Sequence, residues 1–230
     1  RLLARSWRSP APALHRRDPA GHGPLREAIA RHLNAVRGLQ CTAAEVIVTS
    51  GAQQGIDLVA RLLCEAGEGA WIEDPGYPGL RGPLRATGLE TLPVPVDEQG
   101  MAVDAALARP EGVRLAVVTP SHQYPLGVTL ALERRLALLD WAHARGGWIV
   151  EDDYDSEFRY AGRPLASLRG LDADRAPGRE RVIYLGSFSK VTFAGLRIGY
   201  LVVPRALADD FARARRTLED HGSVVAQPAL

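Results

Sequence analysis

The chain has 230 residues, of which 46% are hydrophobic and 24% charged, so it can bury the core of one large domain or two small ones. Its 28 basic and 27 acidic side chains are interspersed, with a formal net charge of +1. This argues against a nucleic-acid surface on this segment, because phosphate binding needs concentrated positive charge. We expect no membrane span and no signal peptide, because no apolar run has the required length. Cys41 and Cys64 lack metal-binding spacing and disulfide density, which fits a cytoplasmic protein.

Residues 1 to about 17 are rich in Arg, Pro and Ala and have little periodicity, which predicts an arm or linker. A turn at residues 18–24 precedes a helix with Leu25, Ile29 and Leu33 on one face. We therefore divide the chain into residues 1–40, the arm and opening helix, and residues 41–230, a large domain. Because the chain starts with arginine and stops after an apparent helix junction, we expect it to be an internal piece of a longer protein.

A short β-branched strand at residues 46–49 leads into a small-residue turn at residues 50–55 and then into a helix. Such a turn leaves free backbone amides at the helix start, where the helix dipole favours an anion. We predict a phosphate-binding cup at this point. An ordinary strand-to-helix turn is the alternative.

The next strand, at residues 69–73, ends in a proline-glycine turn that holds Tyr77. An aromatic ring in such a turn can lie flat against a planar ligand, and stacking contributes about 1 kcal/mol. A tyrosine that merely caps the turn is the alternative. A helix-turn-strand passage to residue 96 and a short helix at residues 103–108 follow.

Residues 115–119 form a fully apolar strand, as a parallel sheet buried on both faces requires. The turn after this strand contains His122 and Tyr124, and a helix at residues 131–145 packs its leucines on the sheet. His122 could bond a ligand, although a single histidine in a turn is often only solvated.

The strand at residues 148–150 runs into an acidic segment that extends to Tyr160. Carboxylates crowded at the end of a buried strand repel one another, so we expect a positive partner. The positive partner of Asp152 could belong to a bound ligand, for example a protonated pyridine nitrogen. Tyr154 projects from the same strand end on the same side as Asp152, so its hydroxyl could bond an oxygen of the same ligand. Metal binding is the competing use of an acidic cluster, but we expect no metal because no His or Cys spacing accompanies it.

Lys190 is the only lysine of the chain, and it follows a strand at residues 182–185. A partly desolvated lysine amine can condense with a carbonyl, whereas an arginine cannot. Ser187 and Ser189 supply hydroxyls beside it, and the guanidinium of Arg197 completes a phosphate grip. These residue types together indicate a Schiff-base lysine next to a phosphate, as in pyridoxal phosphate sites; a chance surface lysine is the alternative.

The remaining elements complete an alternating pattern. Residues 161–180 read as a polar connection, and after Lys190 we expect a strand at residues 198–203 and a helix opened by Pro204. Short apolar strands that alternate with helices predict an α/β fold with a mostly parallel sheet and helices on both faces, a three-layer sandwich. Ligand groups at the strand ends then share one rim of the sheet.

The motif Ser-Phe-Ser-Lys followed by Gly-Leu-Arg-Ile-Gly-Tyr resembles the cofactor-lysine motif of fold-type I, class I/II aminotransferases. The resemblance covers nearly the whole chain from Asp18 and implies the large domain of such a protein, with pyridoxal phosphate as cofactor and the C-terminal small domain missing. It also implies roles for single residues. Ala52 and Gln53 contact the phosphate with Ser187, Ser189 and Arg197, Tyr77 stacks on the ring, Asp152 pairs with the pyridine nitrogen, and Tyr154 bonds the phenolic oxygen.

One turn departs from the aminotransferase pattern. The family carries Asn-Pro-x-Gly there, with the asparagine on the phenolic oxygen, and Tyr124 takes its place. The run Ser-His-Gln-Tyr-Pro-x-Gly and the acidic run from Glu151 resemble the MocR branch of GntR regulators, in which an aminotransferase-like domain follows a winged helix-turn-helix. Arg16, where an aromatic is common, and Leu126, where a threonine is common, are further departures.

The resemblance implies two functions. In the first, the chain senses an effector for a MocR-type regulator, forming an external aldimine with an amino compound. In the second, it is an active aminotransferase in which freed Lys190 becomes the general base and Asp152 stabilises the carbanion. Either protein is expected to be a homodimer with sites at the subunit interface, and to touch DNA only through an upstream helix-turn-helix. The arginine that fixes a substrate carboxylate in this family would lie beyond Leu230.

Overall fold

The computed structural model describes residues 18–108, 111–155, 166–190, 192, 194–220, 222–223 and 226–230. The expected arm at residues 1–17, with Arg16, lies outside these ranges. So do the end of the acidic run at residues 156–160 and the first part of the polar connection at residues 161–165.

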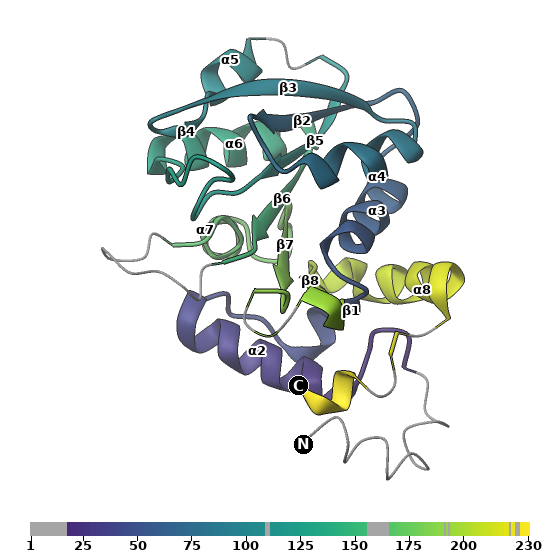
Figure 1. Cartoon of the computed structure of the whole chain (residues 1–230). Coiled ribbons are helices and arrows are strands. Elements are labelled where there is room, and N and C mark those ends of the chain that lie inside the picture. The colour runs from purple at the N-terminus through teal and green to yellow at the C-terminus, as the bar shows by residue number, and fades with distance from the viewer. Residues whose placement is uncertain are drawn as a thin grey trace.

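An eight-stranded sheet forms the centre of the described part of the chain, in the order β1-β8-β7-β6-β5-β2-β3-β4 (Figure 1). The strands are β1 (Val46–Thr49), β2 (Gly69–Asp74), β3 (Glu90–Asp97), β4 (Gly100–Met101), β5 (Val113–Val118), β6 (Trp148–Asp153), β7 (Val182–Ser187) and β8 (Gly199–Val202). β3, β2, β5, β6 and β7 are parallel neighbours. β8 runs antiparallel to both β7 and β1, and β4 runs antiparallel to β3. The expected, mostly parallel α/β sheet is confirmed.

Helices cover both faces of the sheet. They are α2 (Gly23–Arg37), α3 (Ala52–Leu63), α4 (Arg81–Ala86), α5 (Val103–Leu107), α6 (Leu132–Arg145), α7 (Leu168–Arg175) and α8 (Ala208–Glu219). Short 3₁₀ turns, η1 (Ala43–Glu45), η2 (Pro78–Leu80), η4 (Ala194–Leu196), η5 (Arg205–Leu207) and η6 (Gln227–Ala229), connect them. α3, α4 and α8 lie on one side of the sheet, and α2, α6 and α7 lie on the other (Figure 1). This is the expected three-layer arrangement.

The alternation of side chains along each strand explains the two layers of core. In β7, Ile183 and Leu185 point toward α3 and α8, whereas Tyr184 points toward α2, and all three are buried. Strands buried on both faces need apolar residues at every position, which is why they appear in the sequence as continuous apolar runs. α2 packs its expected apolar stripe, including Leu25, Ile29 and Leu33, against β1 and β8.

The prediction of a plain polar connection before β7 is wrong for its second half, which contains α7. Ser167 caps this helix by accepting a hydrogen bond from the Gly170 amide at 3.0 Å. The helix has few apolar side chains, and hydrogen bonds of the fully buried Asp172 attach it to α6 and to the start of β7. One oxygen of this carboxylate lies 2.7 Å from His143 Nε2, and the other accepts the amides of Arg181 and Val182 at 2.6 and 2.9 Å.

We expect Asp172→Asn to destabilise the fold by about 2–4 kcal/mol. The amide would turn its NH₂ toward either the His143 ring or the two backbone donors, and a buried donor would lose its partner. Urea unfolding of both proteins measures the loss. Asp174→Asn, on the exposed side of the same helix, serves as the control and should stay within about 0.5 kcal/mol of the parent.

Candidate functional site

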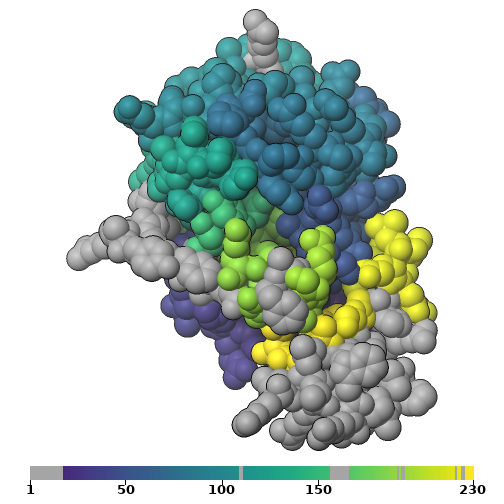
Figure 2. Space-filling view, viewed as in Figure 1, coloured from purple at the N-terminus to yellow at the C-terminus, as the bar shows by residue number. Residues whose placement is uncertain are grey.

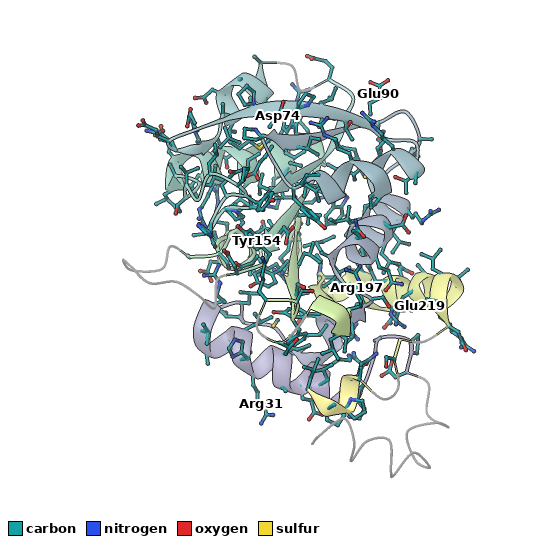
Figure 3. All side chains as sticks on the ribbon, viewed as in Figure 1. Arg31, Asp74, Glu90, Tyr154, Arg197 and Glu219 are labelled. Carbon is teal, nitrogen blue, oxygen red and sulfur yellow. The ribbon has the colours of Figure 1, made fainter. Side chains whose placement is uncertain are left out.

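A cavity of about 270 Å³ opens where β2, β5, β6 and β7 end. Every cofactor-binding residue predicted from the sequence lines it, together with one that was not predicted: Ala52, Gln53, Tyr77, Thr119, Tyr124, Asp152, Tyr154, Ser187, Ser189, Lys190 and Arg197. Tyr154 and Arg197 lie in the middle of the molecule, far from Arg31 on α2 and Glu90 at the start of β3 (Figure 3). In the space-filling view, the yellow-green residues that follow β7 reach the surface beside the blue residues around α3 (Figure 2).

Ala52 and Gln53, the first residues of α3, line the cavity. Gly51 caps the helix with φ +92°, a conformation that suits glycine, so α3 begins at Ala52 without a side-chain cap on its first amides. The guanidinium of Arg197 lies close to Gly51, and a Cβ at that glycine would be 3.4 Å from Arg197 Nη2. Ser187 Oγ and Ser189 Oγ are 3.0 Å apart beside it. Backbone amides, two hydroxyls and a guanidinium together suit a phosphate dianion.

Asp152, at the end of β6, also lines the cavity and is 5% exposed. Its Oδ1 is buried and has no hydrogen-bond partner in the described part of the chain. Burial, with the nearby charges of Asp153, Glu73 and Asp155, raises the pKa of Asp152 to about 7. A cation bound next to this carboxylate would offset both the desolvation cost of the buried charge and the repulsion from the neighbouring carboxylates.

The acidic residues do not crowd into one cluster as expected, because β6 turns alternate side chains to opposite faces. Glu151 and Asp153 face α2 and α7 instead of the cavity. Glu151 accepts the Arg169 amide at 2.9 Å, and Asp153 pairs with Arg37 at 2.9 Å. Part of the expected positive partner is therefore Arg37, which the sequence analysis did not find. Asp152 alone of these three strand residues faces the cavity.

Aromatic rings cover one side of the cavity. Tyr124 makes edge-on contacts with both Tyr77 and Tyr154, with ring centroids 6.2 Å apart in each pair. Burial, followed by the charges of Asp155 and Asp152, raises the pKa of Tyr154, so its hydroxyl keeps its proton and can donate it to an oxygen of a ligand. Tyr77 and Tyr124 remain partly exposed, at 37% and 41%.

Thr119 is the lining residue that the sequence analysis missed. Its hydroxyl donates to Glu73 Oε2 at 2.5 Å, and its amide donates to Glu73 Oε1 at 3.1 Å. Gln123 Nε2 donates to the same carboxylate at 3.1 Å and to the carbonyl of Tyr124 at 2.6 Å. Glu73 thus ties the end of β5 to the turn that carries Tyr124. The sequence feature that could have pointed to Thr119 is Glu73, an acidic residue within the apolar strand β2 that needs a hydrogen-bond donor when buried.

His122, considered as a ligand contact, is not among the cavity-lining residues. Its Nδ1 makes a short contact with Asp155 Oδ2, and its ring stacks beside Tyr154 with centroids 6.3 Å apart. Lys190 lines the cavity but is exposed, so its desolvation would require a bound ligand.

The described ranges hold neither a metal-ion cluster nor a membrane-spanning helix. No group of three or more His, Cys, Asp or Glu side chains within them is arranged to hold a metal ion. No helix among them is long and apolar enough to cross a membrane.

The sheet order, with the lysine after β7, the start of α3 and the buried Asp152 carboxylate at one cavity, is that of the large domain of a fold-type I pyridoxal-phosphate protein. Residues 15–230 match the model of the family described as aminotransferase class I and II. The chain belongs to this family. The unpartnered Asp152 oxygen and the amine of Lys190 fit the two ends of the cofactor ring system, and pyridoxal phosphate is the cofactor of this site.

Relatives include both regulators and enzymes. The chain is 43% identical to the probable rhizopine catabolism regulatory protein MocR of Rhizobium meliloti, over 91% of this chain and 41% of that protein. It is 41% identical to the pyridoxine biosynthesis regulator PdxR of Corynebacterium glutamicum, over 92% of this chain and 46% of that protein. The chain therefore spans less than half the length of these regulators. The crystal structure of LysN, an α-aminoadipate aminotransferase from Thermus thermophilus complexed with N-(5'-phosphopyridoxyl)-L-leucine, superposes with a TM-score of 0.87 at 32% identity, over 99% of this chain and 57% of that one.

We expect the cofactor-free chain to lose stability as the pH rises from about 5 to 7.5. Asp152 and Glu151 have pKa values of about 7 in the fold, against 3.8 and 4.5 for exposed groups. In that window the folded state holds protons that the unfolded state has released, so the free energy of unfolding falls by up to about 1.4 kcal/mol per pH unit for each group. Denaturant unfolding at several pH values measures the slope.

The matched variant is Asp152→Asn, which removes one of the two carboxyls. Its slope over the same pH range should be clearly shallower than that of the parent. Equal slopes would show that Asp152 does not hold a proton in the folded chain near neutral pH.

Proposed function

We propose that this chain is the effector-sensing part of a MocR-type transcription regulator, which binds an amino compound through pyridoxal phosphate. Its higher identity to regulators, 43% and 41%, than to the aminotransferase LysN, 32%, carries this proposal. Tyr124, at the turn where the enzymes carry asparagine, supports it. The whole protein would be a cytoplasmic homodimer that touches DNA through a separate helix-turn-helix. Within this chain, residues 1–40 would comprise the arm that leads from that domain and the entry helix α2, which packs on the cofactor domain at residues 41–230.

When bound, the cofactor supplies an aldehyde for an amine and a ring that withdraws electrons. We assign each end of it to residues of the cavity. The α3 amides at Ala52 and Gln53 would hold the phosphate with Ser187, Ser189 and Arg197, because Arg197 lies beside Gly51 at the start of α3 and all five residues line one cavity. Lys190 would hold the cofactor through its Nζ, in a bond that an incoming amine could replace, with the freed lysine taking up the proton that the amine gives up.

The other end of the cavity would keep the ring oriented and protonated. Asp152 holds a proton on the ring nitrogen, because its buried oxygen has no other partner in the described part of the chain. Tyr154 would donate a hydrogen bond from its hydroxyl to the phenolic oxygen. Tyr77 and Tyr124 cover the ring and shield the reacting amine from water.

The alternative function is that of a working class I/II aminotransferase. The combination of Lys190, Asp152 and Arg197 in one cavity supports it, as does the similarity to LysN over 99% of this chain. After amine exchange, freed Lys190 would act as the general base in proton transfer. The two functions share the binding step and differ in whether the amino group is passed to a 2-oxo acid.

The discriminating experiment uses the full-length protein that contains this chain, loaded with cofactor. Each of a panel of amino acids and simple amines is added, and the cofactor absorbance and the affinity for the promoter DNA next to its gene are recorded. A regulator should show an absorbance change with one class of amine and an accompanying change in DNA affinity, without conversion of a 2-oxo acid. Steady turnover of an amino acid and a 2-oxo acid, with DNA affinity unchanged, would favour the enzyme.

A further inference from the structure

A buried guanidinium outside the cavity joins three elements that carry or adjoin cavity residues. Arg37 is in the last turn of α2, and its side chain is 4% exposed. Its Nη2 lies 2.9 Å from Asp153 Oδ2 at the end of β6 and 2.7 Å from Ser121 Oγ in the turn after β5. Tyr184 of β7 donates its hydroxyl to the same Asp153 oxygen.

These contacts lie directly behind the cofactor site. Asp153 is the residue between Asp152 and Tyr154, so holding its side chain on the α2 face fixes the direction of both neighbours on the cavity face. Ser121 is three residues before Tyr124, within the turn that Arg37 contacts. One side chain therefore connects the strand end that presents Asp152 to the turn that presents the cavity tyrosine.

The charge of Arg37 is as relevant as its geometry. Several titratable groups surround Asp153: His32 and Arg37 from α2, Glu151, Asp152, Tyr154 and Asp155 from β6 and the turn after it, Tyr184 from β7 and Tyr200 from β8. The acidic members outnumber the basic ones. Arg37 also lies at the C-terminal end of α2, where the helix dipole favours a cation. It is the group that offsets the Asp153 charge behind the cofactor ring.

We propose that Arg37 is a positioning residue for the cofactor, which through Asp153 and Ser121 holds the end of β6 against the Tyr124 turn and offsets the negative charge behind Asp152. This inference rests on the proposed cofactor site. The guanidinium keeps its charge when it is buried, and its Nη2 contacts both the carboxylate and the hydroxyl.

The test uses the cofactor-loaded full-length protein and the pH midpoint of its cofactor absorbance. Arg37→Met removes the cation and leaves Asp153 without its basic partner. The site becomes more negative, which favours the protonated form of the cofactor, so the midpoint should rise by about 0.5 to 1 pH unit. Arg37→Met with Asp153→Asn removes both charges and should return the midpoint to within about 0.3 unit of the parent.

Arg134→Met is the control, because Arg134 also makes a close carboxylate pair, with Asp97 at 2.6 Å, but lines no part of the cavity. Its midpoint should equal that of the parent. An unchanged midpoint in Arg37→Met, or a double variant as displaced as the single one, would overturn the inference. If the parent protein itself shows no cofactor absorbance and no borohydride-fixed adduct at Lys190, the proposed cofactor site fails instead.

Discussion

Replacing Lys190 with arginine should abolish the covalent link to the cofactor completely. Arginine keeps the positive charge and nearly the same length, but its guanidinium stays protonated and does not condense with an aldehyde. Because Lys190 is the only lysine of the chain, no other side-chain amine of this chain can take over the bond. Borohydride reduction of the loaded protein, followed by peptide mass mapping, should locate the cofactor on Lys190 in the parent and nowhere in the variant.

The control for this prediction must keep the fold and the lysine. Arg205→Lys adds a second amine on the turn η5, outside the cavity, where the side chain of Arg205 is 62% exposed. Reduction of that variant should still label only Lys190. Labelling of both lysines would indicate nonspecific reaction with the aldehyde, and labelling of the Lys190→Arg variant at another position would remove Lys190 from the mechanism.

Asp152→Asn should slow proton removal from a bound amino acid by a factor on the order of 100 or more. The amide has the same shape but no charge, so it cannot keep a proton on the ring nitrogen, and the ring withdraws electrons less strongly. Exchange of the amino acid α-hydrogen for deuterium, followed by NMR, measures the step whether the whole protein is a regulator or an enzyme. Cofactor affinity should fall as well, by about tenfold or more, because an ion pair in a buried site is lost.

Glu151→Gln is the matched control for this variant. Glu151 is the preceding residue on the same strand and equally acidic, but it faces the opposite side of the sheet and accepts the Arg169 amide. It should change stability more than exchange rate. If both variants slow exchange equally, the effect comes from general damage to β6, and the special role of Asp152 is lost.

Most of the strands and every described cavity residue except Thr119 could be predicted from the sequence, whereas the short strand β4 could not. The strand expected at residues 182–185, which extends to Ser187 in the structure, is recognisable because a strand buried on both faces must be apolar. Lys190 stands out because its chemistry cannot be replaced by the arginine used elsewhere. Both signals are local, and a short window of sequence contains them.

Features that depend on contacts between distant segments were not predictable in this way. α7 depends on Asp172, which is buried only because His143 and the start of β7 surround it. Arg37 looks like any surface arginine at a helix end until Asp153, 116 positions later, lies 2.9 Å away. Thr119 is held at the cavity by its hydrogen bonds to Glu73, at the end of the neighbouring strand β2. In each case the role of the residue depends on a partner that is distant in the sequence, so the residue and its neighbours along the chain do not reveal it.

The antiparallel direction of β8 has a consequence for which ligands this site can accept. Because β7 and β8 form a hairpin, with Ser187 paired to Gly199, the amine of Lys190 and the guanidinium of Arg197 belong to one short connection. Both groups line the same cavity, so we expect the distance from aldehyde carbon to phosphorus in a bound ligand to match the span between them. An analogue with one extra methylene between ring and phosphate would have to give up either the covalent bond or the phosphate contacts. We therefore expect the site to select ligands by the distance between their aldehyde and phosphate groups.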